Sequence, residues 1–170
     1  MTFDGPAEPY APLEPVATCD PTPKPGVIAF RNWVLENWEG VSAGIARACD
    51  IGNPSKHHEG RAWDWTAPDK ATADELLLEL LAPEGPELEA LARRAGLRTI
   101  IWWGRIWIAG HGWIPYTGNP HRDHVHFGFS WAGARGETSF YQELEGGGGF
   151  RVVPFALACC LVAAAVMISR

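Results

Sequence analysis

Apolar residues recur at helical intervals in three parts of the chain. This spacing predicts amphipathic helices over residues 25–38, 71–81 and 84–95. Each has a recognisable signal at one end: a proline that suits a first turn, a side chain that can cap an N-terminus, and a terminating glycine. The residues that carry these signals are Pro25 for the first helix, Asp69 or Thr72 for the second, and Gly96 for the third.

Other stretches follow the two-residue period of a β-strand. Residues 124–130 alternate in polarity, so His124 and His126 should lie on one face of a strand and apolar side chains on the other. Two shorter apolar runs, 99–103 and 106–109, flank a glycine-arginine pair and predict a hairpin. Helices and short strands in this irregular order predict an α+β fold, with a small antiparallel sheet flanked by helices.

Both ends of the chain differ from its middle. Residues 1–26 are rich in proline and lack apolar periodicity, which predicts an extended arm that lies on a domain or hangs from it. The domain itself would cover 27–145, and a glycine-rich linker follows at 146–151. Residues 152–168 carry no charge and would span about 26 Å as a helix. We therefore expect a C-terminal transmembrane helix in 152–170, with a buried terminal helix as the alternative.

Charge and cysteine content narrow the possible partners and compartments. The net charge is −6 with both signs interspersed, so no basic stripe is available for nucleic acid. Cys159 and Cys160 lie in the apolar tail as small hydrophobes. Cys19 and Cys49 remain, either as a disulfide, which would imply an oxidising compartment, or as buried free thiols.

Histidines and one aspartate form two clusters with metal-binding character. Three of the six histidines lie within residues 121–126, and SKHHEGRAWDW supplies His57 and Asp64 on either side of a glycine. Zinc commonly takes imidazole nitrogen and carboxylate oxygen, and catalytic zinc sites have three protein ligands. His57, Asp64 and one histidine of the second cluster would make such a set on one sheet face. For the HxH tripeptide alone, two half-exposed surface histidines are the alternative.

The two clusters together carry a family resemblance. The pattern S-x-H-x-x-G-x-A-x-D is matched in full, and so is H-x-H; the matching residues are Ser55, His57, Gly60, Ala62, Asp64, His124 and His126. These motifs resemble the zinc signature of the D-Ala-D-Ala metallopeptidase superfamily, which also includes murein endopeptidases and the Hedgehog amino-terminal domain. The resemblance covers roughly residues 19–143 and is strongest to cell-wall-associated proteins of high-GC Gram-positive bacteria and their phages.

The resemblance implies a role for each site residue. His57, Asp64 and His126 would bind Zn²⁺, and His124 would be a hydrogen-bonding group beside them. Dipeptidases of the superfamily have a glutamate as general base three residues before HxH. In this sequence His121 stands there, as a histidine does in some murein endopeptidases.

Two further residues are candidates for catalysis. Asp123 is a second candidate base, or a partner that orients His121 or His124. Arg47, ten residues before His57, matches the arginine that family members use to stabilise an oxyanion or a substrate carboxylate. Arg105 is the alternative for this arginine.

The sequence thus predicts a zinc metallopeptidase of the carboxypeptidase or endopeptidase type, acting on peptidoglycan stem peptides in wall remodelling or phage lysis. The alternative is a zinc-containing wall-binding module without turnover, favoured by the missing glutamate. An unrelated interaction protein would leave the zinc motif unexplained. The expected location is the cell envelope, with the domain anchored by its tail and exposed outside the cytoplasm. The bond that is cut, the export route and a host or phage origin stay open.

Overall fold

The computed structural model describes residues 3–50 and 54–146, which form an α+β domain around one antiparallel sheet. The sheet has six strands in the order β1-β2-β6-β3-β4-β5, so the last strand in the sequence lies between β2 and β3. All neighbouring strands run antiparallel. The strands are β1 Val41–Gly44, β2 Ala62–Thr66, β3 Leu97–Trp102, β4 Arg105–Ile108, β5 Gly112–Pro115 and β6 Val125–Phe129.

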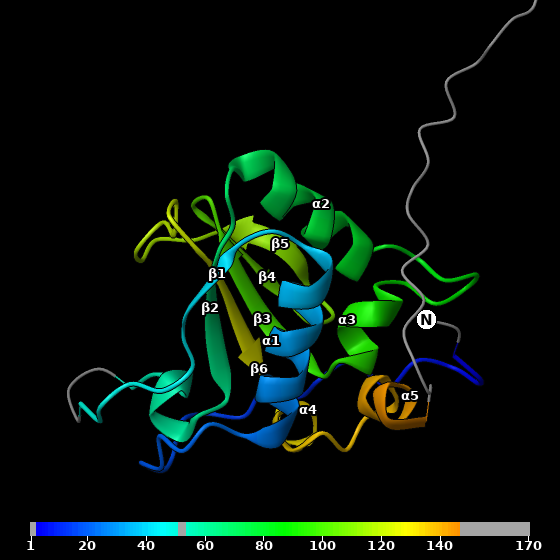
Figure 1. Ribbon diagram of the computed structural model, residues 1–170, viewed down its shortest axis with the longest axis horizontal. Helices are drawn as coiled ribbons and strands as arrows, with labels where there is room; N and C mark the ends of the chain where they lie inside the picture. The colour runs from blue at the N-terminus through cyan, green and yellow to red at the C-terminus, as the bar shows by residue number, and fades with distance from the viewer. Residues whose placement is uncertain (1–2, 51–53, 147–170) are drawn as a thin grey trace, which may run out of the picture.

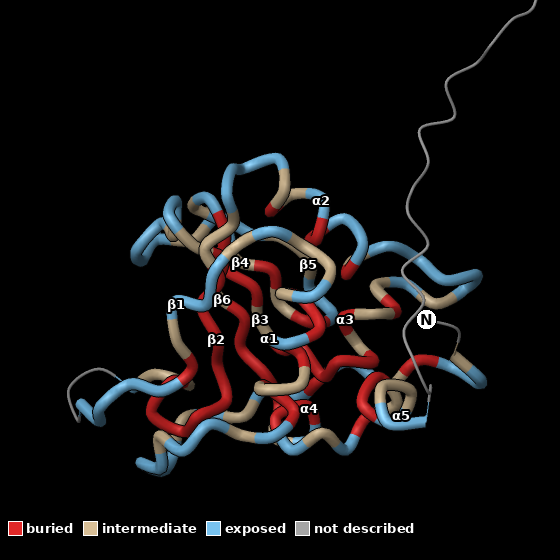
Figure 2. Tube along the Cα trace, in the orientation of Figure 1, coloured by how far each residue is buried: buried red, intermediate tan, exposed pale blue. Residues whose placement is uncertain are grey.

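Helices cover one face of this sheet. They are α1 Pro25–Asn37, α2 Lys70–Leu80, α3 Ala90–Arg94, α4 Trp131–Arg135 and α5 Ser139–Gly146. A 3₁₀ helix, η1 at Lys56–Glu59, precedes β2. Figure 1 shows α1 crossing in front of the sheet, with α2 above it. The ring of Phe30 in α1 packs against Phe127 and Phe129 of β6, with ring centroids 5.4 and 5.3 Å apart. Figure 2 shows the buried residues concentrated in the central strands behind α1.

The strongest periodic segments fold as the sequence predicts. The helix expected over 25–38 is α1, and the helix expected over 71–81 is α2. Asp69 is the N-cap of α2, and its Oδ1 accepts a hydrogen bond from the backbone nitrogen of Thr72 at 2.8 Å. The predicted hairpin is formed by β3 and β4, although its turn lies one residue earlier, at Trp103 and Gly104.

The helix expected over 84–95 is shorter than predicted. Only Ala90–Arg94 is helical, because Glu84 and Glu87 exchange backbone hydrogen bonds of 2.8 and 3.0 Å around Gly85 and Pro86. A glycine with φ of 57° followed by a proline cannot continue a helix. The sequence patterns also did not predict β1 and β5, which are four residues long each.

The N-terminal arm lies on the domain rather than hanging from it. Glu59 Oε1 accepts hydrogen bonds from the backbone nitrogens of Ala17 and Thr18 at 2.9 and 3.0 Å. Farther along, Arg61 Nη2 donates to the carbonyl oxygen of Glu14 at 2.9 Å. Cys19 and Cys49 form a disulfide, which decides between the two arrangements that the sequence left open.

One part of the predicted fold class is wrong. No helix in residues 3–50 and 54–146 is long and apolar enough to cross a membrane. The segment 152–170, for which a transmembrane helix was expected, lies outside the described residues. The fold that residues 3–50 and 54–146 show is therefore an α+β domain, and no membrane-spanning helix is part of it.

Candidate metal centre

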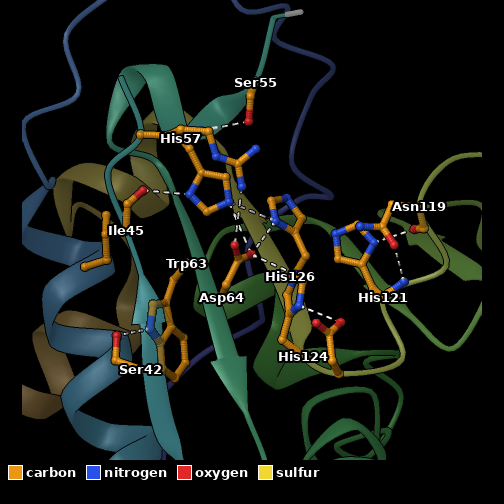
Figure 3. Close-up of polar contacts among 12 residues, drawn as sticks. Ser42, Ile45, Ser55, His57, Trp63, Asp64, Asn119, His121, His124 and His126 are labelled. Carbon is orange, nitrogen blue, oxygen red and sulfur yellow. Dashed lines mark hydrogen bonds and ion pairs between the residues drawn. The ribbon is translucent and has the colours of Figure 1, made fainter. Parts of the chain in front are cut away.

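Three side chains from three different elements meet on the uncovered side of the sheet. His57 belongs to η1, Asp64 to β2 and His126 to β6. Asp64 and His126 are direct partners in the β2-β6 ladder, so their side chains leave the same face side by side. Figure 3 shows the His57 ring reaching the same point from the η1 side.

A glycine makes the approach of His57 possible. Gly60 ends η1 with φ of 62°, a left-handed conformation that reverses the chain from η1 into β2. A Cβ atom at this position would lie 1.9 Å from the carbonyl oxygen of Thr22 in the N-terminal arm. The position of His57 relative to Asp64 therefore requires a glycine at residue 60, because of its left-handed backbone angle and because a side chain would not fit.

The distances among the three side chains suit a metal ion. Asp64 Oδ1 lies 3.2 Å from His57 Nε2 and 2.8 Å from His126 Nδ1, and these two nitrogens are 3.2 Å apart. All the candidate ligand atoms lie within 4.8 Å of one another. Two donor atoms that share a tetrahedral zinc ion at about 2.0–2.1 Å lie about 3.3 Å apart. The His57-Asp64-His126 group could therefore hold a metal ion.

The tautomer of His57 independently supports a cation at this point. His57 Nδ1 lies 2.7 Å from the carbonyl oxygen of Ile45, which can only accept, so Nδ1 carries the proton. In the neutral ring, Nε2 then presents its lone pair to Asp64 Oδ1, another acceptor. Two acceptors facing each other in a buried site repel unless a positive charge lies between them.

The protonation states of the other two side chains favour metal binding as well. Burial lowers the pKa of His126 to about 4, so this ring is neutral at pH 7 and has a lone pair to offer. Burial opposes ionisation of Asp64, but its close contacts with the imidazoles of His126 and His57 outweigh burial and hold the pKa of Asp64 below its ordinary value. Metal ligands must be deprotonated in this way.

The remaining predicted histidines and Asp123 line one side of the group. His124 Nε2 lies 3.8 Å from Asp64 Oδ1, and its Nδ1 lies 3.0 Å from Asp123 Oδ1. The ring of His121 makes edge contacts with both neighbouring rings, with its centroid 4.6 Å from that of His124 and 5.6 Å from that of His126. Asp123 is exposed and faces His124.

Only one of the two candidate arginines contacts the group. Arg47 Nη2 lies 3.7 Å from Asp64 Oδ2, and more than half of its side chain is exposed. Arg105 instead lies over the ring of Trp113, which is on β5. The structure thus places Arg47 beside the ligands and Arg105 elsewhere.

Two contacts of the site were not identified from the sequence. The carbonyl of Ile45 orients His57, and the carbonyl of Asn119 lies 2.5 Å from His121 Nδ1. Both are backbone groups, so no residue type marks them in a sequence. His121 also has φ of 48°, a left-handed angle that a non-glycine residue adopts only when its surroundings impose it.

Comparisons with known proteins give one match. The family model described as VldE, C-terminal domain, matches residues 19–127, more than half of the chain. This range holds all three residues of the metal group together with Arg47, His121 and Asp123. No curated protein and no solved structure matches the chain. The chain belongs to the VldE C-terminal domain family.

Proposed function

We propose that the protein is a zinc-dependent peptidase that hydrolyses D-amino-acid-containing peptide bonds of peptidoglycan. The observation that carries the proposal is the convergence of two imidazole nitrogens and one carboxylate oxygen, with the proton of His57 held on the far side of its ring. This donor set is typical of zinc, and three protein ligands leave a fourth position for water or substrate. Structural zinc sites, by contrast, usually have four protein ligands.

A zinc ion bound here would supply a water of lowered pKa and polarise a substrate carbonyl. The chain itself supplies the proton acceptor. His121 Nδ1 donates to the carbonyl oxygen of Asn119, so the lone pair of the neutral ring is on Nε2. Burial lowers the pKa of His121, which keeps this ring neutral at pH 7 and able to accept a proton at Nε2.

The neighbouring charged side chains would position the reacting groups. His124 Nδ1 faces the carboxylate of Asp123, and this contact orients its ring beside Asp64. Arg47 extends a half-exposed guanidinium next to the metal group, where it can bind a substrate carboxylate or a developing oxyanion.

The substrate class is inferred from the motif resemblance. The peptides of the bacterial wall lie outside the cytoplasm, and the Cys19–Cys49 disulfide is consistent with an oxidising compartment. We therefore place the domain at the cell envelope, acting on stem peptides. A second candidate, a zinc-containing wall-binding module without turnover, is favoured by one observation: a histidine occupies the position where dipeptidases of the resembled superfamily have a glutamate.

Metal analysis of the purified chain, together with digestion of purified peptidoglycan, tests the proposal. We expect about one zinc per chain and the release of new amino groups, and the products will distinguish cleavage of a terminal residue from cleavage of a cross-link. His57→Ala, Asp64→Ala and His126→Ala should each remove most of the zinc and lower the melting temperature, because the metal binds only the folded state.

The matched control is His111→Ala, which removes an exposed histidine outside the metal group and should keep its zinc. Full zinc occupancy in His126→Ala would contradict the ligand assignment. Zinc binding and retention on the cell wall without any release of amino groups would support the non-catalytic module instead.

A further inference from the structure

A row of directly paired residues crosses the sheet from the metal group to its far edge. Asp64 of β2 pairs with His126 of β6, and His126 pairs with Ile101 of β3. Ile101 in turn pairs with Ile106 of β4, and Ile106 pairs with Ile114 of β5. Directly paired residues point their side chains to the same face of a sheet. The isoleucine row of Ile101, Ile106 and Ile114 therefore continues the line of the candidate ligands on the uncovered side.

The isoleucine row is apolar where the water-facing side of an antiparallel sheet is usually polar. The opposite face of the same strands forms the core, in which Ile100 of β3 pairs with Trp107 of β4 and both are fully buried. The exposed fraction rises along the row from 8% at Ile101 to 42% at Ile114, and Ile106 between them is half-buried. Packing against the helices therefore does not explain these isoleucines, and exposed apolar surface of this kind marks binding sites.

Side chains occupy both flanks of the row beside the metal group. On one flank, the ring of His121 lies 5.6 Å from that of His126, and the backbone oxygen of His121 accepts a hydrogen bond from Trp103 at 3.1 Å. On the other flank, the alkyl stem of Lys56 covers Gly128, where a Cβ atom would lie 3.1 Å from Lys56 Cδ. Gly128 lies two residues after His126 on the same face of β6. A peptide that reaches the metal group between these flanks therefore lies across the strands rather than along them.

The two ends of this path across the strands differ in chemistry. Arg47, which follows β1, lies with its Nη2 3.7 Å from Asp64 Oδ2 on the β1 side of the metal group. The isoleucine row lies on the opposite side, on β3, β4 and β5. A guanidinium suits the carboxylate end of a peptide, whereas isoleucines suit an uncharged side chain. Because the carboxylate end follows the cleaved bond, the residue over the isoleucine row is the one that presents its carbonyl to the metal group.

We propose that the isoleucine row is the subsite for an uncharged, apolar side chain on the substrate residue whose carbonyl is cleaved. Neighbouring strands are about 4.8 Å apart, so Ile101 and Ile106 lie about 5 and 10 Å from His126, within reach of a side chain on a residue bound at the metal group. A charged side chain placed there would lose its water against isoleucine without gaining a partner.

This subsite rests on the proposed peptidase function and narrows the bonds that such an enzyme would cut. In a stem peptide, alanine meets the condition that the isoleucine row sets, whereas glutamate and the diamino acid carry charge. The row therefore favours a bond that follows alanine.

Two synthetic peptides that differ only in this residue test the subsite on the full chain. They are N-acetyl-L-lysyl-D-alanyl-D-alanine and N-acetyl-L-lysyl-D-glutamyl-D-alanine. Cleavage is measured as release of D-alanine, and binding by calorimetric titration. We expect the D-alanyl peptide to be favoured by about tenfold or more, both in kcat/KM and in affinity. Ile106→Lys should reverse this preference, because the added ammonium group would pair with the D-glutamyl carboxylate.

Leu78→Lys is the matched control, because it places the same charge on an exposed apolar residue of α2, on the helix-covered side of the sheet. It should leave the preference of the native chain unchanged. Ile114→Lys changes the most exposed position of the isoleucine row, so it should fold, and it should shift the preference in the same direction as Ile106→Lys.

The possible outcomes separate the subsite from the peptidase function. Equal binding and equal cleavage of the two peptides, or a preference that both variants of the row leave unchanged, would overturn the subsite and keep the peptidase. Preferential binding of the D-alanyl peptide without release of D-alanine would keep the subsite and remove the peptidase proposal. Absence of both binding and cleavage would overturn both.

Discussion

His57 illustrates how a single backbone contact sets the chemistry of a side chain. The carbonyl of Ile45 holds the proton on Nδ1, so that Nε2 is the atom presented to Asp64 and His126. The carbonyl of Asn119 does the same for His121. In both rings a backbone carbonyl oxygen determines which nitrogen carries the proton. Every residue has such an oxygen, so the sequence does not mark this contact.

The role proposed for His121 can be tested by its pH dependence. Burial lowers the pKa of His121 below its ordinary value of about 6.5, and the base must be neutral to act. Peptide cleavage should therefore be retained at pH 7 and lost as the pH falls through a value below about 6.5. His121→Glu should move this loss towards the ordinary glutamate pKa of about 4.3, measured as initial rates across pH.

His121→Ala should lower the rate by about 10²- to 10⁴-fold while zinc remains bound, because a general base holds no metal. An unchanged rate in this variant would transfer the proton acceptor to another group. Loss of zinc from it would show that His121 is a ligand.

At the scale of elements, the N-terminal arm is held by the buried ion pair of Glu59 and Arg61. Glu59 and Arg61, 1% and 0% exposed, form an ion pair of 2.5 Å, and the remaining acceptor capacity of Glu59 is taken by Ala17 and Thr18 of the arm. The 3₁₀ helix η1 and the proline-rich arm are thus joined through one carboxylate.

Glu59→Ala should destabilise the protein by about 3–5 kcal/mol, because it leaves the Arg61 charge buried without its close partner. Urea unfolding would measure this loss. Glu59→Gln should cost less, since its amide oxygen can still accept from the arm. Glu75→Ala on the exposed side of α2 is the control and should change stability little. Equal stability of Glu59→Ala and the control would contradict this account of the arm.

The lowered pKa of Glu59 determines whether acid stabilises or destabilises the folded protein. Burial raises the pKa of Glu59, but hydrogen bonds from Ala17 and Thr18 and the charge of Arg61 outweigh it and hold the pKa below its usual range. A depressed folded-state pKa contributes stability that is present above the unfolded value of about 4.3 and is lost as the pH falls through the folded one. The arm should therefore stay attached at neutral pH.

At the scale of the whole molecule, the disulfide links the arm to the segment that follows β1. Cys19 and Cys49 are 30 residues apart in sequence, and the loop between them contains α1 and β1. The backbone nitrogen of Arg47, two residues before Cys49, donates to the carbonyl oxygen of His57 at 3.3 Å. The disulfide therefore also restrains the segment that contains Ile45 and Arg47, which contact His57 and Asp64.

Replacing both cysteines by serine should lower the free energy of unfolding by about 3–4 kcal/mol, because the open loop regains conformational entropy when the chain unfolds. Denaturant unfolding with and without reductant would measure the loss. Reductant should destabilise the native protein and leave the double variant unchanged. A double variant as stable as the native protein would mean that the arm contacts alone hold this region.

Local signals in the sequence determined a large part of this protein. Periodicity and end signals predicted α1, α2 and β6, because a helix or strand with one buried face must repeat its apolar residues at a fixed interval. The same alternation placed His124 and His126 on one face of a strand. His57 and Asp64, only seven residues apart around a glycine, were recognisable as one half of a metal site.

Contacts between distant segments decided the rest. Insertion of β6 between β2 and β3 brings His126 beside Asp64, 62 residues earlier, and pairing of Cys19 with Cys49 closes the arm onto the domain. The orientation of His57 and the isoleucine row beside His126 arise in the same way. Strand pairing and backbone hydrogen bonds use groups that every residue has, so their partners are set by the packed chain as a whole and leave no mark in any local pattern.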